Sequence, residues 1–288
     1  MELNAKQFFD GSFAYKALHL HEHDMDIGGG KITKEDIDIL AGFPKAEIVA
    51  VSGLRQDTFE YLIRTYGRQL KAISFLKNKM VEDWTLLGSL PQLQYIYWFS
   101  NHRIEKLWDM SGNTELKGLL ISDFTRLHSI EGVEKAPSLR YFSIGNAIWL
   151  TMTVDSLMPL ANTKITHLEF FGNKIADGNL SFFQSMTQLE HFDCSLKLLP
   201  TEHFAWIAAN CPNVKGRALC AGEEGVVYET NGTGESVMLP GIYIAGKRKP
   251  ALSYEGNERR IQKYIDAFEQ MKEQYRGIPF LDAFPKYD

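Results

Sequence analysis

A short apolar pattern recurs six times along the middle of the chain. Each copy has apolar residues at the first, fourth and sixth positions of a six-residue window, and successive windows begin 23, 23, 23, 26 and 24 residues apart. This spacing predicts a short strand with one buried face. Since one such strand cannot close a core, the repeat predicts strands stacked in a parallel sheet, with the chain returning outside it. The windows are 70–75, 93–98, 116–121, 139–144, 165–170 and 189–194.

Two of the repeated segments extend into a longer motif. Residues 165–175 read I-T-H-L-E-F-F-G-N-K-I, and residues 70–80 follow the same order with Asn78 at the ninth position. This motif resembles the L-x-x-L-x-L-x-x-N-x-L unit of the leucine-rich-repeat family. The resemblance implies an α/β solenoid with a parallel β-sheet on its concave face, short helices or turns on its convex face, and a cap at each end.

The resemblance also implies a ladder of asparagine side chains that bond the backbone of adjacent turns. Asn78 and Asn101 stand at the ladder position in two consecutive repeats. Phe124, Ala147 and Lys197 stand there in three others, which predicts an interrupted ladder and irregular repeats.

The flanks of the repeats predict three regions: an N-terminal cap with a first strand–helix unit (1–45), the repeats (46–216) and a C-terminal cap (217–288). Strands are expected at 16–20 and 47–51. Helices are expected at 33–42, where Thr33 and Asp36 form a weak capping-box signal, and at 56–66.

The repeat period ends near residue 216. Residues 225–239 predict a hairpin that turns at 231–234, and residues 241–245 are expected to add a strand. Residues 258–275 predict an amphipathic helix.

The third, fifth and seventh positions of each window are expected to point away from the core. Aromatic side chains gather there, and on a rigid exposed face they are typical anchors for protein partners. The alternative is that they pack across strands, or lie under a cap or loop. The candidate binding residues are Tyr95, Tyr97, Phe99, Tyr141, His167, Glu169, Phe171, His191 and Asp193.

The family resemblance implies a non-enzymatic protein-interaction module: an adaptor, a regulator or an inhibitor. An alternative is that residues 217–288 carry an enzymatic activity that the repeats direct to a target. Nucleic-acid binding through Lys71, Lys117 and Arg140 is disfavoured by the net charge of -5. We expect a protein partner, no cofactor, no membrane span and a cytoplasmic location; the oligomeric state stays open.

Candidate chemistry outside the repeats is weak. His19, His21 and His23 alternate along a strand and could converge on a metal ion, although a solvated strand end is favoured. Gly28–Lys31 lacks the spacing of a phosphate-binding loop and predicts a turn. The basic run Lys247–Lys249 predicts a solvated loop. Three cysteines are too few for a disulfide framework and fit a reducing compartment.

Overall fold

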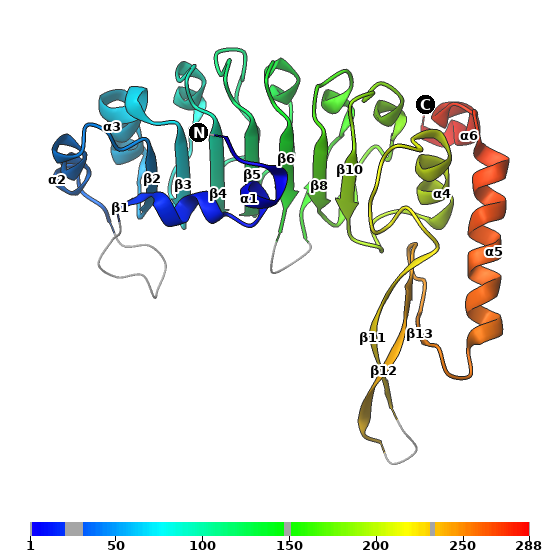
Figure 1. The fold of residues 1–288 in the computed structure, drawn as a ribbon. Coiled ribbons are helices and arrows are strands. Elements are labelled where there is room, and N and C mark those ends of the chain that lie inside the picture. The colour runs from blue at the N-terminus through cyan, green and yellow to red at the C-terminus, as the bar shows by residue number, and fades with distance from the viewer. Residues whose placement is uncertain (1, 21–30, 147–150, 231–233, 288) are drawn as a thin grey trace.

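Eight short parallel strands form one open sheet that follows the order of the chain (Figure 1). The computed structural model describes residues 2–20, 31–146, 151–230 and 234–287. The strand order is β1-β2-β3-β4-β5-β6-β8-β10, so each strand pairs with the next strand of this sheet along the chain. The strands are β1 (Leu18–Leu20), β2 (Ile48–Ser52), β3 (Ala72–Leu76), β4 (Tyr95–Asn101), β5 (Gly118–Phe124), β6 (Tyr141–Gly145), β8 (His167–Phe171) and β10 (His191–Cys194).

The strands pair in the register that the repeated windows predict. Ile73 lies opposite Ile96, which lies opposite Leu119, and the same fourth position stays aligned through to Phe192. The side chains at the first, fourth and sixth positions of all six windows are buried, and none is more than 4% exposed. The apolar columns predicted from the sequence are therefore confirmed as the core, within an α/β fold built on a large parallel sheet.

The segments between the strands cover one face of the sheet. The first crossings are α-helical: α2 (Lys34–Ile37), which continues as a 3-10 turn, and α3 (Gln56–Tyr66), which buries Phe59, Leu62 and Ile63. The predicted capping box of Thr33 and Asp36 is present. The segments between β3 and β10 contain 3-10 turns and two short strands, β7 (Thr153–Val154) and β9 (Lys174–Ile175). We call the opposite sheet face, with the third, fifth and seventh window positions, the open face.

Two asparagines bond neighbouring units together. The Asn78 carboxamide accepts from the Leu54 N–H at 2.8 Å and donates to the Val51 carbonyl at 3.0 Å. Asn101 donates to the carbonyls of Asn78 and Val81, both at 2.9 Å, and accepts two backbone N–H groups from its own turn. In the next unit Phe124 is buried instead against Trp84 and Trp98, so packing replaces the ladder there.

The N-terminal segment crosses the open face. Helix α1 (Ala5–Phe9) begins at an Asn4–Gln7 capping box and leads into a 3-10 turn (Ser12–Lys16) before β1. Figure 1 shows this segment running across the middle strands of the sheet. Phe8 and Phe13 are buried in a small cluster with Ala72 and Tyr95, separate from the main core. The open face is therefore partly covered by the chain itself.

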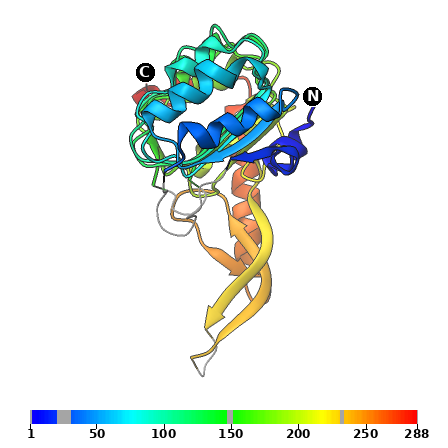
Figure 2. The same cartoon turned by 90° about the vertical axis from the view of Figure 1, so that its left-hand side faces the viewer.

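The C-terminal region closes the last repeat and then projects away from it. Helix α4 (Thr201–Asn210) is the final crossing, and the Trp206 indole N–H donates to the Ile278 carbonyl at 2.8 Å. Strands β11 (Gly222–Thr230) and β12 (Ser236–Ile244) form a long antiparallel hairpin, which extends from the sheet beside α5 (Glu258–Tyr275) in Figures 1 and 2. The chain ends with α6 (Phe280–Ala283) and a 3-10 turn (Pro285–Tyr287).

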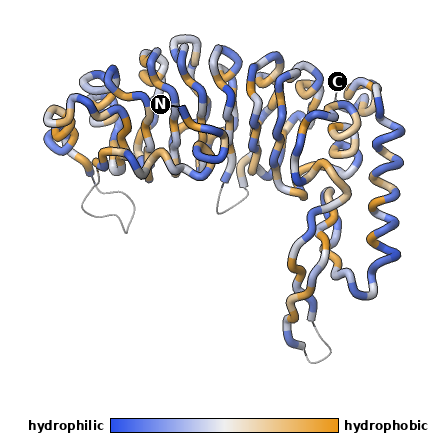
Figure 3. The backbone as a smooth tube through the Cα atoms, viewed as in Figure 1, coloured by the Kyte–Doolittle hydropathy of each residue, from blue (hydrophilic) through white to orange (hydrophobic). Residues whose placement is uncertain are grey.

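The hairpin and the amphipathic helix were predicted, but the extra strand was misplaced. Residues 241–244 are the second half of β12, and the third strand of this sheet is β13 (Ala251–Ser253). Figure 3 shows the apolar stripe of α5, whose residues Ile261 and Phe268 are buried. No helix among the described residues is long and apolar enough to cross a membrane.

Some of the predicted features fall on residues that the structure does not describe. His21 and His23 of the proposed metal cluster lie outside the described residues, as do Gly28, Ala147 and most of the hairpin turn at 231–233. The three cysteines are described and are free thiols, with Cys194 buried in the core.

The asparagine ladder makes a prediction with an internal control. Asn101 is fully buried, so Asn101→Ala leaves several buried backbone groups without a hydrogen-bond partner. The change is expected to lower the free energy of unfolding by about 3 kcal/mol. Asn173 stands at the same repeat position but is exposed, so Asn173→Ala is expected to cost less than about 0.5 kcal/mol. Urea denaturation measures both, and equal losses would contradict a structural role for Asn101.

The docking of the N-terminal segment makes a second prediction. Phe8→Ala removes its buried anchor, and Gly118→Val would place a Cβ about 2.6 Å from the Phe8 ring. Both changes are expected to release residues 2–16 from the open face while the strands keep their protection from hydrogen exchange. Phe43→Ala, at a residue 51% exposed, is the control. Unchanged exchange of the segment in both variants would show that these contacts do not hold it.

Candidate binding face

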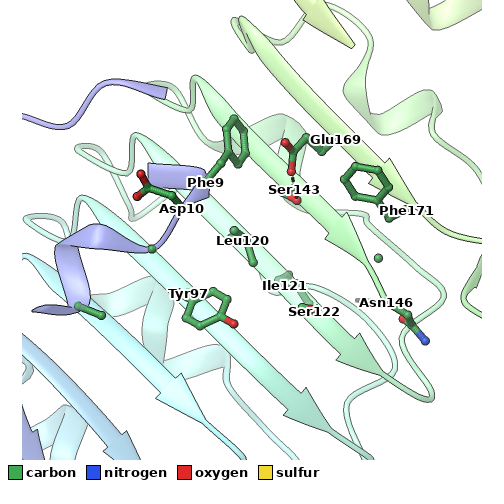
Figure 4. A pocket seen from close by; sticks show the side chains of 13 residues that line it. Phe9, Asp10, Tyr97, Leu120, Ile121, Ser122, Ser143, Asn146, Glu169 and Phe171 are labelled. Atoms are coloured by element: carbon green, nitrogen blue, oxygen red, sulfur yellow. Dashed lines mark hydrogen bonds between the residues drawn. The ribbon is translucent and has the colours of Figure 1, made fainter. Parts of the chain in front are cut away.

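A pocket lies on the open face where the N-terminal segment leaves the sheet uncovered (Figure 4). Its volume is about 790 Å³. Strands β4, β5, β6 and β8 form the floor, and the turn after α1 forms one wall. The lining residues are Phe9, Asp10, Gly11, Ala14, Tyr97, Leu120, Ile121, Ser122, Ser143, Gly145, Asn146, Glu169 and Phe171.

The pocket combines aromatic walls with two acidic groups, Asp10 and Glu169. Phe9, Tyr97 and Phe171 contribute rings from three different elements, as Figure 4 shows. The Ser143 hydroxyl donates to a carboxylate oxygen of Glu169 at 2.8 Å. Burial raises the pKa of Glu169, and this effect outweighs the serine hydrogen bond, which acts in the opposite direction. The Glu169 side chain is therefore a hydrogen-bond acceptor that Ser143 holds in place among largely apolar side chains.

A row of rings runs from the N-terminal segment to the last strand. The Phe9 ring lies 6.1 Å from Tyr141, measured between centroids, and Tyr141 lies 5.3 Å from His167. The next contact is a stacked pair, His167 and His191, with centroids 4.5 Å apart and planes 18° apart. The strand register explains the row, because Tyr141, His167 and His191 occupy the same position of adjacent strands.

The far end of the open face carries acidic groups and one arginine. Asp193 lies 3.5 Å from the Arg217 guanidinium, which also reaches Glu223 of the hairpin at 3.7 Å. The same guanidinium lies 5.9 Å from the centre of the Phe171 ring. Arg217 thus offsets part of the negative charge at this end of the open face, and it connects the sheet to the base of the hairpin.

The structure brings together some of the nine residues predicted for binding and separates others. Tyr97, Glu169 and Phe171 line the pocket, while Tyr141, His167 and His191 form the adjoining ring row. Phe99 and Asp193 are half-buried on the same face.

The expectation that Tyr95 is exposed is wrong. It is 1% exposed beneath Phe8 and Phe13, and its hydroxyl oxygen accepts the Leu3 N–H at 3.1 Å. In this structure Tyr95 holds the N-terminal segment against the sheet. This is the alternative stated for the outward aromatic residues, in which the side chain lies under a cap or loop.

Several residues of the face were missed because they come from outside the repeats. Phe9, Asp10 and Ala14 belong to the N-terminal segment, and no repeat pattern assigns that segment to the open face. Two signals were present: the Asn4–Gln7 capping box, and phenylalanines at 8, 9 and 13 that no predicted strand required. Ser143 and Leu120 stand at the outward fifth position of their windows, but they were not among the residues predicted for binding.

Comparison with known proteins assigns no family to the chain. No protein-family model matches the sequence, and a search of curated proteins finds no match.

The raised pKa of Glu169 has a consequence for stability. Because the folded-state pKa lies above the unfolded value, ionised Glu169 opposes folding, and the penalty grows as pH rises from the unfolded to the folded pKa. Glu169→Gln keeps an acceptor for Ser143, so it is expected to raise the free energy of unfolding at pH 7 and to change it little near pH 3.5.

Denaturation at both pH values checks this expectation. Ser143→Ala is the companion variant: it removes a bond that favours the carboxylate and should raise the pKa of Glu169 further in an NMR titration. A loss of stability at pH 7 in Glu169→Gln would instead show that the carboxylate charge is stabilising.

Proposed function

We propose that this chain is a leucine-rich-repeat-type solenoid that binds another protein, without catalysis, on the open face of its sheet. The pocket beside the N-terminal segment is the observation that carries the proposal. Pockets that join aromatic walls to a few placed polar groups are the usual form of specific binding sites. An adaptor, a regulator and an inhibitor would all use such a face in the same way.

The chemistry of the pocket favours one kind of anchor from the partner. Its rings suit an aliphatic stem, and the Glu169 carboxylate suits a positively charged end. A lysine or arginine side chain has both features. Entry of a cation would also lower the pKa of Glu169 and so remove the cost of keeping an ionised carboxylate there.

The hairpin offers a second contact for the same partner. Val226, Tyr228 and Met238 are 51%, 68% and 65% exposed, and Tyr228 pairs directly with Met238 across the two strands. Large apolar side chains that cluster in this way mark interaction surfaces more often than single exposed ones do. The hairpin projects from the end of the sheet that carries Phe171 and Asp193, so a partner seated on the open face could reach both.

The test compares partner capture by wild type and by a double variant. Tyr97→Ala with Phe171→Ala removes two walls of the pocket without touching the core columns. Proteins retained from the native host's lysate by the wild type are expected to fall at least about tenfold in the variant, in line with the loss of two aromatic anchors. Quantitative mass spectrometry gives the ratio for each protein.

The matched control removes an exposed ring from another surface. Phe43→Ala, in the crossing between β1 and β2, should retain the same proteins as the wild type. The thermal midpoint of the double variant should stay within about 2 °C of the wild type, because the side chains removed are half-buried on the open face. Equal retention by the double variant would reject the pocket as the binding site.

A further inference from the structure

A second group of side chains on the open face has the composition of a metal site. One donor atom each of His167, Glu190 and His191 lies within 4.8 Å of the other two. His167 and His191 are paired residues of adjacent parallel strands, β8 and β10, and Glu190 precedes His191 at the start of its strand. The strand register therefore places both imidazoles side by side from residues 24 positions apart in the sequence.

Imidazole and carboxylate are ligands that Zn²⁺ prefers, and two histidines with one glutamate leave a fourth tetrahedral position free. Around such an ion the donor atoms lie about 3.3 Å apart, given bonds of about 2.0 Å. The present separations, up to 4.8 Å, are wider, so the side chains must rotate out of the stacked arrangement for both imidazoles to bind one ion. His167 and His191 are half-buried and Glu190 is exposed, so an ion can reach the site from solvent.

The surroundings of His167 favour a metal-binding tautomer. The Thr166 hydroxyl lies 3.0 Å from the His167 Nδ1 and 3.2 Å from the Arg140 carbonyl oxygen, which also accepts the backbone N–H groups of Thr166 and His167. In the tautomer with its proton on Nδ1, His167 donates to this hydroxyl, and its Nε2 presents a lone pair to a metal ion. A hydrogen bond from the second ring nitrogen is the usual support of a histidine that binds a metal.

We propose that His167, His191 and Glu190 form a binding site for Zn²⁺ or a similar first-row divalent ion, with Thr166 as a positioning residue for His167. The free fourth position would hold water or a donor from a partner. The site is separate from the pocket, since none of its three ligands lines that pocket. Loss of metal binding can therefore be told apart from loss of partner binding in the pocket.

The experiment measures Zn²⁺ binding to purified protein without a histidine tag by isothermal titration calorimetry, and Co²⁺ binding by visible absorption. One saturable equivalent per chain is expected, with the absorption of a tetrahedral cobalt site. His167→Ala and His191→Ala should each weaken binding by more than about a hundredfold, and Thr166→Val by about tenfold. Zn²⁺ should also raise the thermal midpoint of the wild type and not that of the histidine variants.

Two further variants distinguish this site from metal binding elsewhere on the chain and from loss of the fold. Glu190 is exposed, so Glu190→Gln leaves the fold intact and should still weaken binding, even if a histidine variant does not fold. A triple variant, His19→Ala, His21→Ala and His23→Ala, should bind Zn²⁺ as the wild type does. Absence of saturable binding, undiminished affinity in His167→Ala, His191→Ala and Glu190→Gln, or loss of binding in the triple variant would each overturn the proposal.

Discussion

The alignment of short parallel strands in a single register is the constraint on which the rest of the structure depends. Each of the six repeat windows buries three apolar side chains, and it can do so only because neighbouring strands continue the same apolar columns. A one-residue slip would exchange the buried and open faces of a strand. The register therefore fixes the core and, in the same step, decides which side chains stand on the open face.

The open face is partly covered by the protein's own chain, and the uncovered part is the surface proposed to bind a partner. Phe8 and Phe13 occupy the part above β3 to β6, where Ala72 and Gly118 leave room for their rings. Tyr95 and Tyr141 contact the N-terminal segment, Tyr97 both packs against that segment and lines the pocket, and Phe171 lines the pocket. Aromatic residues at the outward positions of the strands thus serve two purposes, internal cover and proposed recognition.

Polar groups on the open face are arranged by the same strand pairing. Glu169 receives its hydrogen bond from Ser143, its direct neighbour on the next strand, and His191 stacks on His167 for the same reason. Parallel strands bring identical window positions about 5 Å apart, close enough for hydrogen bonds, stacking or shared ion ligation. A sequence that places titratable residues at matching positions of consecutive repeats therefore builds clusters of them. The proposed metal site and the Glu169 carboxylate of the pocket are both products of this geometry.

The sequence by itself determined the repeats, their register and the buried positions, because apolar spacing alone specifies which side of a strand can face a core. It also placed α3, α5 and the hairpin. Only the tertiary structure decided that residues 2–16 cover Tyr95, that β12 continues through Ile244, and that Arg217 contacts both Phe171 and Asp193. Those contacts join segments with no common period: residue 8 meets residue 141, and residue 217 meets residues 171 and 193. No local sequence pattern encodes such contacts, because they arise only when the stacked sheet brings distant parts of the chain together.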